Sequence, residues 1–146
     1  MVIKMKENIN ALDEIHKGSC MGMDAIHFIL EKVENESFKD LLEKQYNSYK
    51  KINEEIEKVY PKYNDDKPHS TTLMNQAMTF YGIEMKTMMD KSDSKVAELL
   101  VQGTNMGIIE GRKVLNNKNI NDEVNKLIDE YVAMQEKYLE DLKQYL

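Results

Sequence analysis

The sequence predicts an all-α protein in which two related helical hairpins pack as a four-helix bundle and a fifth helix joins them. Apolar and small residues recur at alternating spacings of three and four in five separate segments, which is the period of an amphipathic helix. Pro and Gly are few, at 2 and 6 of 146 residues, as is typical of helical proteins. The pentapeptide Gly-Ser-Cys-Met-Gly at 18–22 recurs as Gly-Thr-Asn-Met-Gly at 103–107, which indicates an internal duplication.

The first hairpin is expected over about residues 8–60. Its first helix should cover 8–33, where small or apolar residues form one seam: Ile9, Leu12, His16, Ser19, Met23, Ile26, Leu30 and Val33. Ser37 is the expected N-cap of the second helix, because a short polar break precedes it. The second helix should end near residue 60, with a seam of Phe38, Leu42, Gln45, Tyr49, Ile52, Ile56 and Val59.

The connector and the second hairpin follow the same pattern. Polar residues and Pro over 64–68 predict a loop. A helix is expected next, over about 70–90, with a stripe of Met74, Met78, Tyr81, Met85 and Met88. Ser92 or Asp93 should cap the following helix. The second hairpin is expected over about 94–145, so the 146 residues are predicted to form a single helical-bundle domain.

The length of the connector determines the predicted topology. A connector helix from Thr71 to Met89 spans about 28 Å at 1.5 Å per residue, enough to traverse the bundle, and would make the second and fourth helices parallel. An up-down bundle with one long crossover resembles the ferritin-like superfamily, and is most similar to its rubrerythrin-like bacterial members. This resemblance covers nearly the whole chain and rests on its organisation. Di-iron and di-manganese members carry Glu on each first arm and Glu-x-x-His on each second arm, whereas neither second arm here contains a histidine.

Polar residues occupy the seam in the middle of both second arms, at Gln45, Tyr49, Tyr131 and Gln135. Pairing Gln45 with Tyr131, and Tyr49 with Gln135, preserves a polar layer between the two copies. We predict that these side chains form a hydrogen-bonded layer at the level where relatives hold metal, because buried amides and phenols need partners. The alternative is that the tyrosines are ordinary core aromatics with solvated hydroxyls.

A second group of polar residues lies along one side of the first helix, at His16, Cys20, Asp24 and His27. Spacings of four, four and three bring neighbours within reach, and imidazole with thiolate suits zinc or copper. His69 is a candidate ligand from the connector. The second half carries Val101, Asn105, Ile109 and Arg112 at the equivalent positions. The alternative to a metal site is therefore a core histidine with half-exposed neighbours.

Glycine pairs four residues apart mark both first arms, at Gly18, Gly22, Gly103 and Gly107. Each glycine costs a helix about 0.5–1 kcal/mol relative to Ala, so matched positions imply a compensating gain. We expect the gain to be a close crossing of the first and fourth helices, with room for a small ligand as the alternative. The methionine-rich connector has three interpretations, namely core filler, an adaptable binding surface and copper(I) capture.

Composition excludes several classes of function. The formal charge is −6 with a single arginine, Arg112, which argues against a nucleic-acid surface. One cysteine in the chain favours a reducing, cytoplasmic compartment. No apolar run is long enough for a membrane span, and no signal peptide is expected. Met21, Phe28 and Met106 lie off the predicted seams and should be covered either by the connector or by a homodimer interface.

The sequence therefore favours a binding or structural module over an enzyme, with no cofactor expected and a homodimer as the working assembly. No nucleophile with an adjacent base is evident. Two alternatives remain open: a metal-dependent oxidoreductase with an unorthodox site built from the histidines, cysteine and aspartate of the first helix, and a soft-metal protein that binds copper.

Overall fold

A computed structural model describes residues 2–64, 68, 81–116 and 119–146 of the chain. Over these residues the protein is all-α and packs as a ferritin-like bundle, as predicted. The helices are α1 (Val2–Leu30), α2 (Glu36–Val59) with a short 3-10 turn η1 (Tyr60–Lys62), α4 (Asp93–Leu115) and α5 (Asp122–Lys143). Residues 81–87 form a further helical segment.

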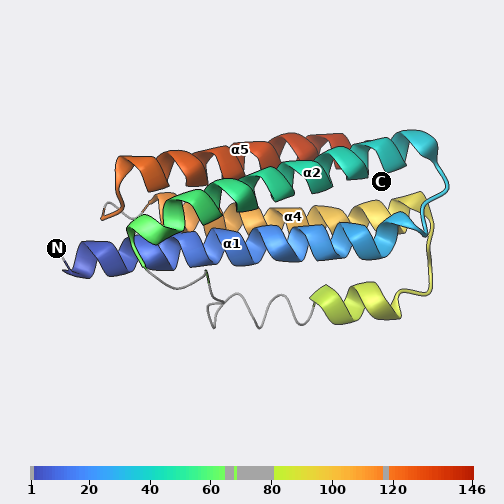
Figure 1. Cartoon of the computed structure of the whole chain (residues 1–146). Coiled ribbons are helices and arrows are strands. Elements are labelled where there is room, and N and C mark those ends of the chain that lie inside the picture. The colour runs from blue at the N-terminus through green and yellow to red at the C-terminus, as the bar shows by residue number, and fades with distance from the viewer. Residues whose placement is uncertain (1, 65–67, 69–80, 117–118) are drawn as a thin grey trace.

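The chain direction in Figure 1 gives the topology of the bundle. Helices α1 and α2 run antiparallel as one hairpin, and α4 and α5 do so as the other. Helices α2 and α4 run in the same direction, as predicted. Within the hairpins α1 packs on α2 and α4 on α5, and between them α1 packs on α4 and α2 on α5.

The polar residues between helices determine where each helix begins. Asn35, not Ser37, is the N-cap of α2, because its Oδ1 accepts hydrogen bonds from the backbone N–H groups of Ser37 and Phe38. Ser92 caps α4 through a hydrogen bond from the backbone N–H of Lys95. The Asn35 side chain also donates to Asp93 Oδ2 at 3.1 Å, which ties the turn of the first hairpin to the start of the second.

The predicted seams supply much of the core, but on α1 Ile15 and Ile29 are buried, whereas His16, Met23 and Leu30 of the predicted seam are only half-buried. Fully buried side chains come from all four long helices and include Leu12, Ile26, Phe38, Ile56, Leu99, Ile128 and Leu142. The Phe38 ring stacks on Tyr145 with centroids 4.2 Å apart, which closes the end of the bundle at the C-terminus of α5. Removal of these apolar surfaces from water is the main force that holds the hairpins together.

The helical segment 81–87 covers part of α1. Its Tyr81 and Met85 are buried, whereas Ile83 is exposed. The predicted connector positions 69–80, including His69, Met74 and Met78, lie outside the described residues. Met21 and Phe28 of α1 line a surface groove together with residues 81–86, so the connector flanks them, and Met106 packs partly buried against the core.

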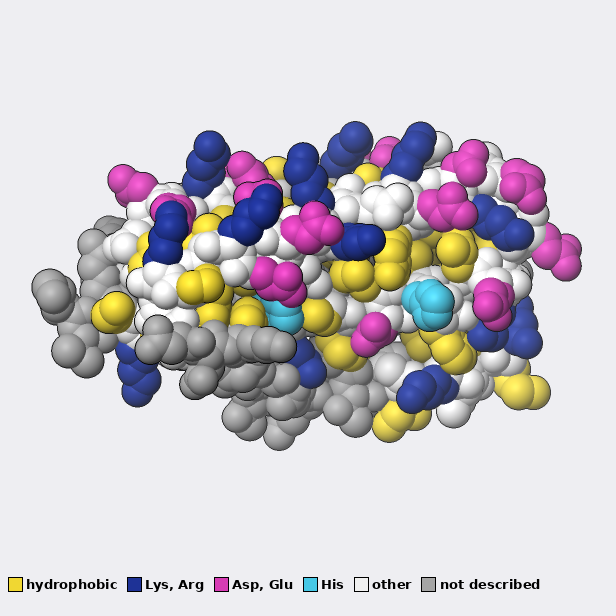
Figure 2. Space-filling view, viewed as in Figure 1, with side chains coloured by type: hydrophobic (Ala, Val, Ile, Leu, Met, Phe, Trp, Pro, Cys, Tyr) yellow, Lys and Arg dark blue, Asp and Glu magenta, His cyan; other side chains and the backbone are white. Residues whose placement is uncertain are grey.

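The face formed by α1 and α2 is charged and mixed in sign. Figure 2 shows Lys and Arg side chains interspersed with Asp and Glu over the face formed by α1 and α2, with hydrophobic side chains between them. Among the described residues, no helix combines the length and apolarity that crossing a membrane requires.

Candidate functional site

A layer of polar side chains crosses the middle of the bundle. Gln45 and Tyr49 reach it from α2, Thr104 from α4, and Tyr131 and Gln135 from α5, and each is at most 3% exposed. The spacing of four residues within α2 and within α5 places each Gln-Tyr pair on one face of its helix, directed at the other hairpin. The layer therefore joins the two halves of the chain.

Two hydrogen bonds run between the hairpins in this layer. Tyr49 Oη donates to Gln135 Oε1 at 3.0 Å, which is the predicted pair. Gln45 does not pair with Tyr131, because its Nε2 donates to Thr104 Oγ1 at 3.1 Å. Gln135 Nε2 donates to the backbone carbonyl of Tyr131 at 3.4 Å. The Tyr131 ring instead lies against Tyr49, with centroids 6.4 Å apart and planes tilted by 55°.

The glycines of the first arms make room for these side chains. A Cβ on Gly22 would lie 2.5 Å from the Tyr49 ring, and one on Gly107 would overlap the Gln135 amide. A Cβ on Gly103 would lie 2.5 Å from the Tyr81 ring. The nearest atoms at these three positions belong to side chains of α2, α5 and the connector, so each glycine makes room for a side chain. A close crossing of α1 and α4 at these glycines stays a prediction.

Gly18 is buried, and with Gly22, Gly103 and Gly107 it lines a small cavity beside Gln45 and Gln135. This cavity measures about 20 Å³, close to the least space that one water molecule needs. The alternative role of the glycines, room for a small ligand, is limited by that volume to a ligand about the size of a water molecule.

The layer is electrically neutral. Burial raises the pKa of Tyr49 to about 12, partly offset by the neighbouring polar side chains of Gln45 and Thr104. Burial likewise raises the pKa of Tyr81 and of Tyr131 above the ordinary range of tyrosine. The phenols therefore stay protonated at physiological pH, and the amides and the threonine carry no charge.

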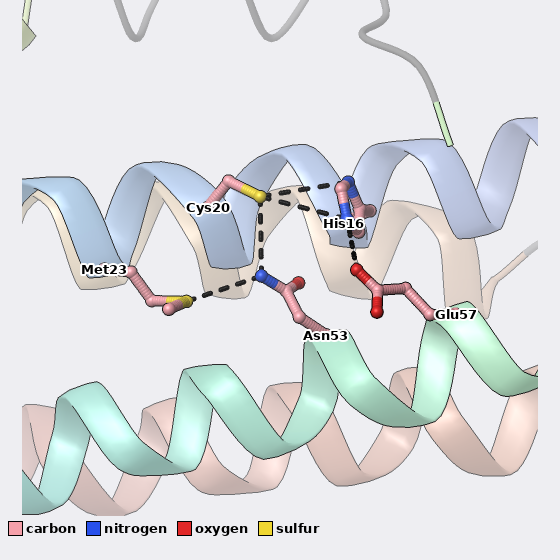
Figure 3. Close-up of polar contacts among 5 residues, drawn as sticks. All are labelled: His16, Cys20, Met23, Asn53 and Glu57. Carbon is pink, nitrogen blue, oxygen red and sulfur yellow. Dashed lines mark hydrogen bonds and ion pairs between the residues drawn. The ribbon is translucent and has the colours of Figure 1, made fainter. Parts of the chain in front are cut away.

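A second cluster, the His16–Cys20 cluster, lies between α1 and α2 and comprises His16, Cys20, Met23, Asn53 and Glu57 (Figure 3). The Cys20 Sγ atom is 3.8 Å from His16 Nδ1 and 3.9 Å from Nε2. Asn53 Nδ2 donates to two sulfur atoms, Cys20 Sγ and Met23 Sδ, at 3.4 Å each. His16 Nε2 is 4.0 Å from Glu57 Oε1.

Burial keeps the two titratable groups of α1 in this cluster neutral. Desolvation lowers the pKa of His16, against the opposing effect of Glu57 and Asp13. Desolvation also raises the pKa of Cys20, partly offset by the hydrogen bond from Asn53. Because the thiolate is the nucleophilic form, a buried protonated Cys20 is a poor nucleophile.

The structure brings only part of the predicted metal set together. His16 and Cys20 are in contact, whereas Asp24 and His27 are exposed and line the groove beside residues 81–86. Within the described part of the chain, no three His, Cys, Asp or Glu side chains gather in an arrangement that would hold a metal ion.

The sequence of this chain matches a known protein family, and its fold is similar to that of a solved structure. A family model, described as a domain of unknown function (DUF2383), matches residues 7–117. The chain belongs to this family. The fold is similar to that of the bacterioferritin-related protein of Bacteroides fragilis, described as a dodecameric thioferritin, with a TM-score of 0.68 and 13% identity over 97% of this chain and 84% of that one. No curated protein gives a significant match.

In this DUF2383 chain, sequence reasoning missed three residues that complete the two sites. The sequence did contain an indication for Thr104, because the equivalent residue in the first half, Ser19, also carries a small hydroxyl group. Both residues are buried. For Asn53 and Glu57 the indication in the sequence was weaker: they follow Tyr49 at intervals of four and so lie on the same face of α2. The choice of Thr104 over Tyr131 as the partner of Gln45 depends on three-dimensional packing.

Proposed function

We propose that this protein is a non-catalytic ferritin-like bundle that serves as a binding or structural module, with its middle closed by hydrogen bonds. The observation that carries the proposal is the direct bond between Tyr49 and Gln135 across the two hairpins. In the metal-binding members of the fold, carboxylates and histidines from four helices project into the core of the bundle. In this chain, the polar layer in the middle of the core consists of amide, phenol and hydroxyl groups.

A pair of iron or manganese ions does not fit this donor set. Two divalent ions need several anionic oxygen ligands to balance their charge. Gln45, Thr104 and Gln135 supply none, and the raised pKa of Tyr49 keeps its phenol neutral. The same layer also leaves only a cavity of about 20 Å³. We therefore derive no oxidation chemistry from the middle of this bundle.

We further propose that the bundle assembles with copies of itself, with a dimer as the smallest unit. The support is the similar fold of the bacterioferritin-related protein, which is described as dodecameric. Most soluble oligomers are symmetric homo-oligomers, and two-fold dimers are the commonest of them. The mixed charge of α1 and α2 in Figure 2 is compatible with such pairing.

Iron oxidation in air tests the first part of the proposal. Iron(II) is added to the full-length protein, purified without an affinity tag, and the ferric product is followed by absorbance. We expect the rate of a buffer blank, while an active ferritin under identical conditions serves as the positive control. Catalytic oxidation above the blank, lost in a Gln45→Leu variant, would overturn the proposal.

Light scattering coupled to gel filtration tests the assembly. We expect a mass of at least two chains, which should not depend on added iron because no metal bridges the copies in this proposal. A mass of one chain across a wide range of protein concentration would contradict self-association. That outcome would leave the account of the polar layer untouched.

A further inference from the structure

We propose that His16, Cys20 and Met23 form a binding site for a single copper(I) ion, which the amide of Asn53 occupies in the metal-free protein. These residues follow one another at intervals of four and three on α1, so they share one face of the helix. Figure 3 shows that the Cys20 and Met23 side chains and the Asn53 amide converge in the space between α1 and α2.

The position of Asn53 marks the site. Its side chain is 9% exposed, and its Nδ2 lies 3.4 Å from each of two sulfur atoms. Its Oδ1 is buried without a hydrogen-bond partner among the described residues. Thiol and thioether sulfurs are weak acceptors. The Asn53 amide is therefore held by two weak hydrogen bonds only, and its Oδ1 forms none. Displacing it from between the sulfurs therefore loses little.

The donor set selects copper(I) by its softness. Thiolate and thioether ligands favour copper(I), and imidazole also suits copper. Zinc in a structural site takes four ligands, usually Cys and His, whereas this cluster supplies one of each. Three donors of this kind match the low coordination number of a soft monovalent cation.

Glu57 is a positioning residue, because it lies where it can orient the imidazole of His16. Its Oε1 lies 4.0 Å from His16 Nε2, and a carboxylate commonly receives the second N–H of a histidine that binds metal. Both ring nitrogens lie at similar distances from Cys20 Sγ, 3.8 Å for Nδ1 and 3.9 Å for Nε2, so the contact with Glu57 makes the choice: an N–H at Nε2 directed at Glu57 leaves the lone pair of Nδ1 available. Glu57 would thus fix the tautomer that binds.

Binding is a ligand exchange with no change of oxidation state. The Cys20 thiol loses its proton to solvent, a copper–sulfur bond forms, and the resulting cysteine–copper(I) unit is neutral. A neutral unit is compatible with the half-buried position of Cys20. The duplicated hairpin has Asn105 and Ile108 where the first has Cys20 and Met23, so the bundle does not require these sulfurs for folding.

Anaerobic titration with copper(I) against a colorimetric copper(I) chelator tests the site on full-length, untagged protein. We expect one copper(I) per chain, with X-ray absorption showing two sulfur ligands and one nitrogen. Cys20→Ser should weaken binding by more than ~100-fold, and Glu57→Gln by about tenfold. Met23→Leu should weaken it while leaving the circular dichroism spectrum and Tm unchanged.

Met106→Leu is the matched control, because Met106 lies on α4 in the repeated pentapeptide and should not alter copper binding. Failure to bind copper(I), or binding that survives Cys20→Ser and Met23→Leu, would overturn the proposal. An equal loss in Met106→Leu would overturn it too, since methionines would then bind copper nonspecifically. The iron test of the polar layer involves none of these residues, so the two proposals can fail separately.

Discussion

In the α1–α2 hairpin, Gly22 admits the ring of Tyr49, and in the α4–α5 hairpin Gly107 admits the amide of Gln135. These positions are equivalent in the duplicated sequence, so both hairpins bury one polar side chain against a glycine at the same height. The hairpins differ one turn away. There the first carries the His16–Cys20 cluster, while Val101 and Asn105 replace its imidazole and thiol in the second.

This comparison separates what maintains the fold from what carries chemistry. Features that occur in both halves contribute to packing, because each hairpin must bury its seam against the other. A feature present in one half only is free of that requirement. The neutral polar layer draws on both hairpins and contributes to packing. The His16–Cys20 cluster occurs in one hairpin only, and the predictions below test this distinction.

The largest effect is expected at Gly22. Gly22→Ala should lower the free energy of unfolding by about 3 kcal/mol, because the new methyl group overlaps the buried Tyr49 ring. Gly82→Ala is the matched control, since its Cβ would meet no described atom within 4 Å; it should raise stability by up to ~1 kcal/mol through helix propensity. Urea unfolding measures both, and equal effects would contradict the packing role of Gly22.

The second largest effect is expected at alkaline pH, which should lower the free energy of unfolding through Tyr49 in the polar layer. The unfolded chain releases the Tyr49 proton near the ordinary tyrosine pKa of about 10, whereas the native protein holds it until about pH 12. Stability is therefore fully present below pH 10 and falls as pH rises, by about 2 kcal/mol at pH 12. Tyr49→Phe should remove this part of the loss, and unfolding curves from pH 9 to 12 measure it. An identical alkaline loss in the variant would contradict burial of a neutral phenol.

A much smaller effect is expected at Asn53, whose equivalent in the second hairpin is Leu139. Asn53→Leu removes a buried amide that bonds only to sulfurs and has an unpaired Oδ1. Stability should stay constant or rise by up to ~1 kcal/mol, as measured by Tm and chemical unfolding. A loss above that amount would show that the cluster maintains the fold, and the distinction between the hairpins would fail.

The smallest effect is expected at the surface. Arg112 and Glu136 form an ion pair at 2.9 Å between α4 and α5, with about half of each side chain exposed. The first hairpin has His27 and Lys50 at the equivalent positions. Arg112→Gln should cost less than ~0.5 kcal/mol in dilute buffer and nothing at high salt. A large, salt-resistant loss would mean that surface charge distinguishes the hairpins.

The sequence predicted the fold better than the sites, for a physical reason. Helix periodicity and the repeated pentapeptide report local conformation and duplication, and both appear in the order and direction of α1, α2, α4 and α5. The predicted pairing of Tyr49 with Gln135 used the symmetry of the copies. Gln45 instead bonds Thr104, because which of two nearby hydroxyls accepts depends on side-chain reach across helices.

The candidate metal ligands were predicted from the pattern of one helix alone, and for this reason only part of the set was found together. Residues at intervals of three and four along α1 include Asp24 and His27, but these lie on its exposed side. The neighbours that complete the His16–Cys20 cluster are on α2. Periodicity within α1 contains no information on which of its flanks α2 covers.

A double-mutant cycle on Tyr49 and Gln135 tests most directly that hydrogen bonds close the middle of the bundle. Urea unfolding of Tyr49→Phe, Gln135→Leu and the double variant yields the coupling energy between the two side chains. The account predicts a coupling of about 1 kcal/mol, as for a buried hydrogen bond. A coupling near zero would contradict it.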